Sequence, residues 1–136
     1  MVVAAWCDEV LALGRSHGLD AVGVTPAAVL ERARRALYER REAGLADTMQ
    51  FTYKNPDRST DPFAAVAGAQ SVVVAARSYE RPLPEHPGVG SARVARYAWE
   101  DHYAPLRDGL WAIARRLRAD GFRAVAYADD NSVVDR

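Results

Sequence analysis

The sequence contains very little cysteine, and this absence limits the chemistry that the chain can carry. Cys7 is the only cysteine among the 136 residues. A single thiol excludes an internal disulfide and any metal cluster that would need several cysteines from this chain. Cys7 lies next to Trp6 in a segment with helical spacing, so we interpret it as a small buried hydrophobic residue.

Long apolar runs, a basic amino terminus and a surplus of charge are also missing. No apolar stretch approaches the roughly 20 residues that span a bilayer. The chain reaches Asp8 without a preceding basic segment, which argues against a secretory signal peptide. We therefore expect a cytoplasmic protein with no membrane contact. The 18 basic and 18 acidic side chains balance, so a basic surplus cannot be used to argue for general nucleic-acid binding.

Common catalytic and metal-binding motifs are absent as well. The sequence has no glycine-rich phosphate loop, no paired-cysteine spacing and no Gly-x-Ser-x-Gly turn. The three histidines, His17, His86 and His102, are far apart and lack the spacing of metal ligands. We therefore predict no metal site built from them.

Hydrophobic periodicity is present and predicts a mixed chain. Helices are predicted over residues 3–17, 26–43, 62–65 and 104–119, and strands over residues 20–25, 71–76 and 122–128. The segment 71–76 is apolar almost throughout, which is typical of a central strand covered on both faces. This order predicts an α/β or α+β fold. We expect a single domain over residues 1–136, with a small sheet flanked by helices.

Local signals place the ends of these elements and the faces of the helices. Thr25 and Pro26 are predicted to open the second helix as N-cap and first residue. Gly18, Gly44 and Gly121 are predicted to end helices, because glycine adopts the left-handed conformation readily. The expected inward residues are Val3, Trp6, Val10 and Leu13 in the first helix, Val29, Leu30, Ala33 and Leu37 in the second, and Leu106, Leu110, Ile113 and Leu117 in the last.

The first candidate site is the polar segment Asn55–Pro62, which is dense in turn residues and predicted to be mostly loop. It can present Arg58 to an anionic group in a cleft. The alternative is a surface turn in which Asp57 and Asp61 act as local caps.

The second candidate site is the pair Asp129 and Asp130, which directly follows the last predicted strand. Ligand and catalytic groups in α/β sheets tend to lie at strand carboxyl ends. Repulsion between adjacent carboxylates can raise one pKa toward a value useful for proton donation. Neighbouring side chains on an extended chain point in opposite directions, so only one of the pair would face a cleft. The alternative is two solvated turn aspartates.

The third candidate site interleaves aromatic and arginine side chains over residues 93–103. Arg96, Tyr97 and Trp99 lie just before Asp101-His102-Tyr103. Such a pattern can stack on and clamp a flat ligand. The alternative is a strand, predicted over 93–99, whose residues alternate inward and outward.

Five segments together resemble the epoxyqueuosine reductases. They are Leu19-Asp-Ala-Val-Gly-Val-Thr-Pro26, Asn55-Pro-Asp-Arg-Ser-Thr-Asp-Pro62, Ala69-Gln-Ser-Val-Val-Val-Ala-Ala76, Arg93-Val-Ala-Arg-Tyr-Ala-Trp99 and residues 129–136, in this order. The resemblance implies a cytoplasmic oxidoreductase that reduces epoxyqueuosine to queuosine at the wobble position of tRNA. It also implies a cobalamin cofactor and two four-iron clusters.

The resemblance further implies roles for individual residues. Asp129 matches the family's proton donor to the opened epoxide, and Arg58 matches an arginine near the cobalamin. Ser91, Arg96 and Tyr97 lie where the family contacts the cofactor or the substrate, and Asp129 is also expected at the cofactor.

The sequence departs from the family pattern in three places. The family's terminal motif, Asp-Thr/Ser-Gly-Pro, here reads Asp129-Asp130-Asn131-Ser132, so either aspartate can be the acid. The family's Asp-Tyr-His here reads Asp101-His102-Tyr103, which leaves the roles of histidine and tyrosine open. The eight cluster cysteines are missing from this chain, and we expect them in a carboxyl-terminal iron–sulfur half or in a separate partner.

The chain is therefore expected to be a truncated amino-terminal domain, inactive alone. Two alternatives remain. One is a non-catalytic module that binds a corrinoid or a partner protein. The other is a related cobalamin and iron–sulfur reductase, similar to the reductive dehalogenases, with a substrate other than tRNA.

Overall fold

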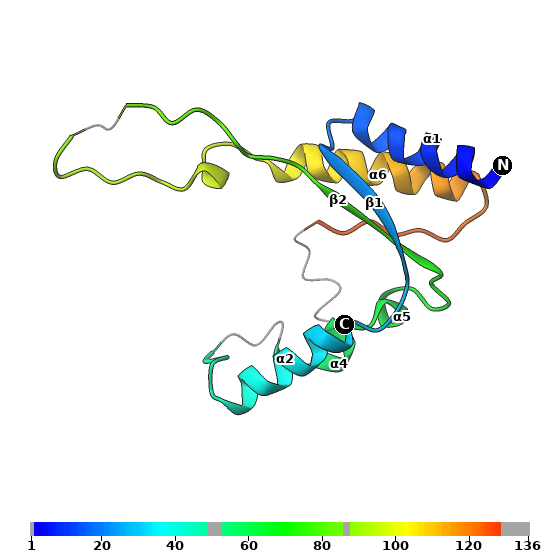
Figure 1. Ribbon diagram of the computed structural model, residues 1–136, viewed down its shortest axis with the longest axis horizontal. Coiled ribbons are helices and arrows are strands. Elements are labelled where there is room, and N and C mark those ends of the chain that lie inside the picture. The colour runs from blue at the N-terminus through cyan, green and yellow to red at the C-terminus, as the bar shows by residue number, and fades with distance from the viewer. Residues whose placement is uncertain (1, 49–52, 86–87, 129–136) are drawn as a thin grey trace.

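The computed structural model describes residues 2–48, 53–85 and 88–128, which form an α+β fold (Figure 1). The elements follow one another as α1 (Val2–Ser16), β1 (Ala21–Pro26), α2 (Glu31–Glu42), α4 (Pro56–Ser59), α5 (Pro62–Ala65), β2 (Ser71–Ala76), the 3₁₀ helix η1 (Arg96–Ala98) and α6 (Tyr103–Ala119). The predicted fold class, a small sheet with flanking helices, is confirmed.

The sheet consists of β1 and β2, which pair antiparallel from Ala21 opposite Ala76 to Pro26 opposite Ser71. Because side chains alternate along a strand, Val22 and its partner Ala75 face the helices, while Val74 points to the other side and is 58% exposed. The prediction of a central strand covered on both faces is therefore wrong. Among the described residues β2 has one neighbouring strand, and helices cover one face.

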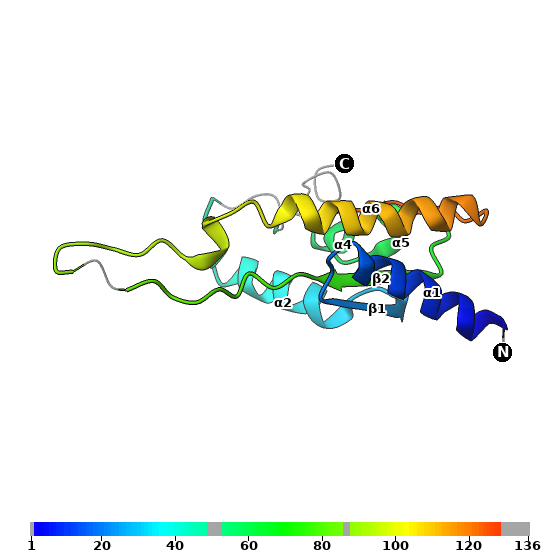
Figure 2. The same ribbon diagram turned by 90° about the horizontal axis from the view of Figure 1, so that it is seen from above.

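Helices α1 and α6 lie side by side against the sheet (Figures 1 and 2). The buried centre of this layer is formed by Val10, Leu19, Val22 and Ile113. Burial of each of these side chains contributes roughly 1.5–3 kcal/mol. Three of the four residues predicted for the apolar stripe of the last helix are confirmed, because Ile113 is in the cluster and Leu106 and Leu117 pack against it. The fourth, Leu110, is half-buried outside this cluster.

Two helical glycines let this layer close tightly. A Cβ atom on Gly109 of α6 would lie 2.6 Å from Leu19 Cγ, and one on Gly14 of α1 would lie 2.7 Å from Ile113 Cδ1. Leu19 therefore occupies the space that a larger residue on α6 would need.

A polar contact joins the start of α1 to the end of α6. The Trp6 Nε1–H donates to Asp120 Oδ2 at 2.7 Å, and Arg116 Nε–H donates to the same oxygen at 2.8 Å. Arg116 also lies 3.3 Å from Glu9. The hydrogen bond from Trp6, followed by that from Arg116, lowers the pKa of Asp120 below its ordinary value. Two helix ends far apart in sequence are thus fixed to each other.

The second helix begins later than predicted. Pro26 pairs with Ser71 as the last residue of β1, and the Ala27 N–H extends the pairing to the Gln70 carbonyl at 3.0 Å. The helix starts at Glu31, and its N-cap residue makes no side-chain capping bond. The assignment of Thr25 and Pro26 as helix openers is therefore wrong, because pairing with β2 continues through them.

The face of α2 also differs from the prediction. Leu30 and Ala33, expected to be inward, are exposed, whereas Arg34, Leu37 and Tyr38 are half-buried. The helix rests on α4 rather than on the main core (Figure 1).

Two segments predicted to be strands are not strands. Residues 122–128 form no ladder, although the Arg118 Nε–H donates to the Ala124 carbonyl at 2.8 Å and holds this segment beside α6. Within 93–99, residues 96–98 form η1 instead. The predicted helix ends are confirmed, because Gly18, Gly44 and Gly121 all have positive φ angles. No helix among the described residues is long and apolar enough to cross a membrane.

Candidate functional site

The polar segment Asn55–Pro62 folds into helical turns rather than loop. Asn55 Oδ1 accepts a hydrogen bond from the Arg58 N–H at 3.1 Å and caps α4. Asp61 Oδ1 accepts from the Phe63 N–H at 2.9 Å and caps α5, as the alternative of a capped surface turn predicts. The proline that follows each cap is tolerated, because a first-turn N–H has no helical partner to lose.

Asp57 is not a local cap but the link between α4 and α2. The Tyr38 O–H donates to Asp57 Oδ2 at 2.8 Å, and Arg34 Nε lies 3.2 Å from Asp57 Oδ1. Arg34 also donates to the buried Thr60 hydroxyl at 3.2 Å. The hydrogen bond to Asp57 raises the pKa of Tyr38 above its ordinary value. These contacts fix the backbone that carries Arg58, whose side chain is half-buried.

The aromatic and arginine segment lies at the base of a long arm. Residues 78–85 extend away from the helices, and residues 88–95 return toward η1 (Figures 1 and 2). Where the arm joins the body, the Tyr79 ring lies 6.4 Å from the Tyr97 ring and 6.1 Å from the His102 ring. The three rings form a cluster in which Tyr97 is 60% exposed. Binding of a flat ligand at this cluster stays a prediction.

His102 carries an unusual polar atom within this cluster. Its Nε2 is buried and has no hydrogen-bond partner among the residues that the structure describes. A buried ring nitrogen without a partner is costly, and a water molecule or a ligand would relieve it. The alternation of aromatic and arginine residues over 93–103 predicts a site in this region, but it does not single out the His102 ring nitrogen.

The predicted site residues do not all come together. Arg96 and Tyr97 lie on η1 next to the ring cluster. Ser91 belongs to the arm, where its hydroxyl donates to the Gly88 carbonyl at 2.6 Å. Arg58 lies on α4, which is separated from η1 in both views (Figures 1 and 2). Asp129 and the neighbouring Asp130 lie outside the described residues.

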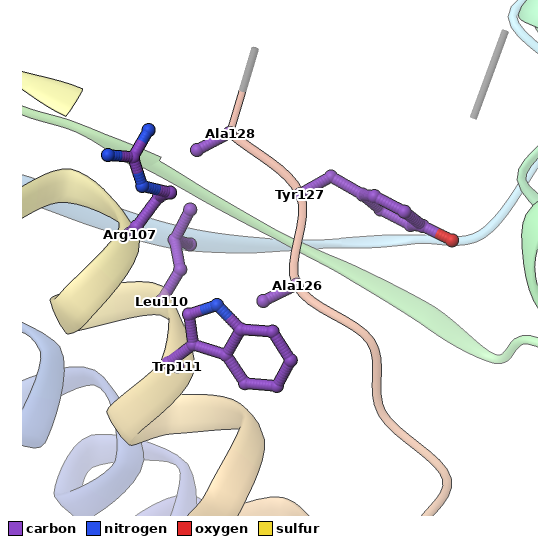
Figure 3. Close-up of a pocket in the computed structure, with 6 residues that line it drawn as sticks. All are labelled: Arg107, Leu110, Trp111, Ala126, Tyr127 and Ala128. Carbon is purple, nitrogen blue, oxygen red and sulfur yellow. The ribbon is translucent and has the colours of Figure 1, made fainter. Parts of the chain in front are cut away.

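A small hollow lies between α6 and the segment that precedes Asp129 (Figure 3). It holds about 50 Å³ and is lined by Arg107, Leu110, Trp111, Ala126, Tyr127 and Ala128. Sequence reasoning placed Leu110 on the inward stripe but missed Trp111 and Tyr127. A tryptophan on the arginine-bearing side of an amphipathic helix was the available signal.

These residues do not, in this arrangement, enclose a corrin. Pockets for drug-sized ligands usually hold about 300–1,000 Å³, far more than the hollow beside Trp111. Arg58, Ser91 and Tyr97 lie on three separate elements. Within residues 2–48, 53–85 and 88–128, no three His, Cys, Asp or Glu side chains gather as metal ligands. In the part of the chain that the structure describes, these residues are therefore not gathered around one corrin-sized hollow.

Comparison with protein-family models gives a match over part of the chain. The family model described as "Epoxyqueuosine reductase QueG, DUF1730" matches residues 59–130, just over half of the chain. No curated protein and no solved structure matches the chain.

Proposed function

The chain belongs to the epoxyqueuosine reductase QueG family through its DUF1730 region, and on this premise we propose that it is the corrin-facing domain of an epoxyqueuosine reductase. The proposed reaction reduces epoxyqueuosine to queuosine at the wobble position of tRNA, in the cytoplasm. The observation that carries the proposal is the family match over residues 59–130.

The matched region contains most of the residues to which we assign a role. Ser91, Arg96, Tyr97 and Asp129 lie inside it, whereas Arg58 lies one residue before it. We assign Ser91, Arg96 and Tyr97 to contacts with cobalamin or substrate, and Arg58 to a position near the cobalamin. The ring cluster at the base of the arm supports this assignment, because exposed aromatic faces beside an arginine suit a flat ligand.

We assign the proton transfer to Asp129. Opening an epoxide leaves negative charge on the former ring oxygen, and a neighbouring carboxylic acid can protonate that oxygen as the charge develops. The proton passes from the Asp129 carboxyl to the oxygen and leaves a carboxylate. The complete reduction takes up two electrons and a second proton and releases this oxygen as water. Asp130 is the alternative donor, because it is adjacent in the sequence.

Electron supply must come from another polypeptide segment. Each four-iron cluster is held by four thiolates, and this chain carries Cys7 alone. We therefore propose that two four-iron clusters are held in an iron–sulfur half or a separate partner, and that the chain alone does not turn over.

Cobalamin retention tests the proposal directly. The purified chain is incubated with hydroxocobalamin and passed through gel filtration, and the absorbance spectrum of the protein peak is recorded. We expect a retained, shifted corrin spectrum that weakens in Tyr97→Ala. The control is Arg35→Gln, an exposed substitution on α2, which should retain corrin like the unaltered chain. If the unaltered chain retains no corrin alone and none when mixed with a cluster-bearing half, the proposal is wrong.

A second candidate, a corrinoid- or partner-binding module without catalysis, is favoured by the single cysteine, because this chain cannot hold an iron–sulfur cluster by itself. The two candidates differ in their response to a cluster-bearing half. An enzyme domain gains epoxyqueuosine reduction on mixing, whereas a binding module does not.

A further inference from the structure

The outer edge of β1 is open, although the main chain there carries strong hydrogen-bonding groups. The Ala27 N–H donates to the Gln70 carbonyl at 3.0 Å, which continues the register of β1 and β2 by one residue. Because hydrogen-bonded and non-hydrogen-bonded pairs alternate in an antiparallel ladder, Gly23 directs its main-chain groups to β2. Val22 and Val24 therefore direct theirs to the opposite edge, where the described part of the chain contains no further strand.

The side chains of β1 also show that this strand is poorly covered. Of its six residues, Val22 is buried and the others are exposed. Val24 lies on the same face as Val22 and is nevertheless 52% exposed, so the helices do not cover the strand along its whole length. On the other face, a Cβ atom added to Gly23 would meet nothing within 4 Å. Figure 2 shows β2 between α6 and β1, which leaves β1 as the outer strand.

The sequence of β1 lacks the features by which proteins usually block an open edge. Charged side chains, prolines and bulges along an edge strand prevent it from pairing with another chain. No charged residue occurs between Asp20 and Glu31, and the proline in this stretch, Pro26, is the last residue of β1. The neighbouring strand β2 is uncharged as well. Charge therefore does not oppose the addition of a further strand.

We propose that β1 pairs antiparallel with β1 of a second copy of the chain, which joins the two sheets into one sheet of four strands. The sequence Val22-Gly-Val24 is palindromic, so a twofold axis at Gly23 places Val22 of each copy opposite Val24 of the other. Each of these two pairs exchanges two hydrogen bonds, which uses the outward main-chain groups of both valines. The same register places Asp20 opposite Pro26, so no like charges face each other.

The chain exposes enough surface for such an interface. Its accessible area is 9754 Å², whereas a folded monomer of 14.9 kDa exposes about 7,000 Å². Each partner in a standard interface contributes about 800 Å², so the surplus exceeds what one interface needs. A second copy is the occupant that presents a matching, uncharged edge.

Analytical ultracentrifugation of the full 136-residue chain across a range of concentrations tests the pairing. We expect a dimer that dissociates on dilution. Val24→Pro removes an outward N–H that β2 does not use, and proline is tolerated at such an edge position. The dimer then loses two hydrogen bonds, and its dissociation constant should rise about 30-fold. The matched control, Val24→Thr, keeps the main-chain groups and the branched side chain, and should change the constant by less than about threefold.

Cross-linking tests the register in a Cys7→Ser background, where the introduced thiol is the only one. Gly23→Cys places two thiols at the twofold axis, in a non-hydrogen-bonded pair with Cα atoms about 4.5 Å apart, which a disulfide can join. Val74→Cys is the control, because Val74 pairs with Gly23 on the same face. Its two copies would lie three strand spacings apart, about 14 Å, which is beyond the reach of a disulfide. After mild oxidation, a non-reducing gel should show a linked dimer for Gly23→Cys alone.

Three results would overturn the proposal. The first is a monomer at every concentration, which would leave the edge to a strand of another polypeptide. The second is undiminished dimerisation by a Val24→Pro variant that circular dichroism shows to be folded. The third is equal cross-linking through Val74→Cys, which would mean that two sheets pack face to face. None of these outcomes depends on cobalamin or on the proposed function.

Discussion

Gly109 offers a sharp test of the packing between α1 and α6, because two physical effects there have opposite signs. Gly109 lies inside a 17-residue helix, where replacement of glycine by alanine ordinarily stabilises by about 1 kcal/mol. In this structure the added Cβ would lie 2.6, 2.8 and 2.9 Å from Leu19 Cγ, Cδ2 and Cδ1. The helix preference and the packing therefore oppose each other in Gly109→Ala.

The packing effect should be the larger one. All three distances are shorter than real Cβ contacts allow, and Cγ cannot swing away as a terminal methyl group can. Leu19 is also fully surrounded, with 2% of its surface exposed. Overpacking of such a core costs about 1–3 kcal/mol. After the gain in helix preference is subtracted, we expect Gly109→Ala to lower the free energy of unfolding by about 1 kcal/mol.

Urea unfolding followed by circular dichroism measures this difference, and a second variant isolates its cause. Leu19→Ala removes the atoms that the new Cβ would meet. In the Leu19→Ala background, Gly109→Ala should stabilise by about 1 kcal/mol, as helix preference alone predicts. The sign should thus reverse between the two backgrounds, which is a coupling between residues in contact. A stabilising effect of the same size in both backgrounds would show that Leu19 does not occupy this space.

Three further outcomes follow from individual contacts. The folded-state pKa of Asp120 is lowered. Its contribution to stability is therefore present above the unfolded pKa near 4 and is lost as pH falls through the folded value. In thermal melts between pH 2 and 7, the Asp120→Asn variant should lose less stability on acidification than the unaltered chain. The raised pKa of Tyr38 means that its contribution is complete below pH 10 and is lost as pH rises through the folded value. Alkaline melts of Tyr38→Phe should lack this loss, and an unchanged alkaline limb would contradict the bond to Asp57. In an assembled enzyme, Asp129→Asn should abolish epoxyqueuosine reduction while cobalamin stays bound. Mass spectrometry of the nucleosides measures the reduction. Full turnover in this variant would show that Asp129 is not the acid.

Parts of the candidate site were predictable because they depend on neighbours in sequence. The interleaved segment around Arg96 and Tyr97 does contribute to a ring cluster with His102, since its residues are close along the chain. The partner ring, Tyr79, comes from the other end of the arm, and no local pattern indicates that pairing. The sequence also predicts Arg58 near the cobalamin. In the structure, Arg58 lies on α4, which the contact between Asp57 and Tyr38 anchors to α2 and which is separate from the ring cluster.

Local signals in the sequence were sufficient to predict the ends of α1 and α6 and the apolar stripe of α6. The apolar stripe on α6 and the glycines that follow α1 and α6 act over one or two helical turns, so periodicity and backbone preference were sufficient. Tertiary structure alone decided that Pro26 belongs to a strand opposite Ser71, that Trp6 bonds to Asp120, and that Trp111 shares a hollow with Tyr127. These outcomes depend on contacts between residues far apart in sequence, whose geometry follows from packing rather than from any local preference.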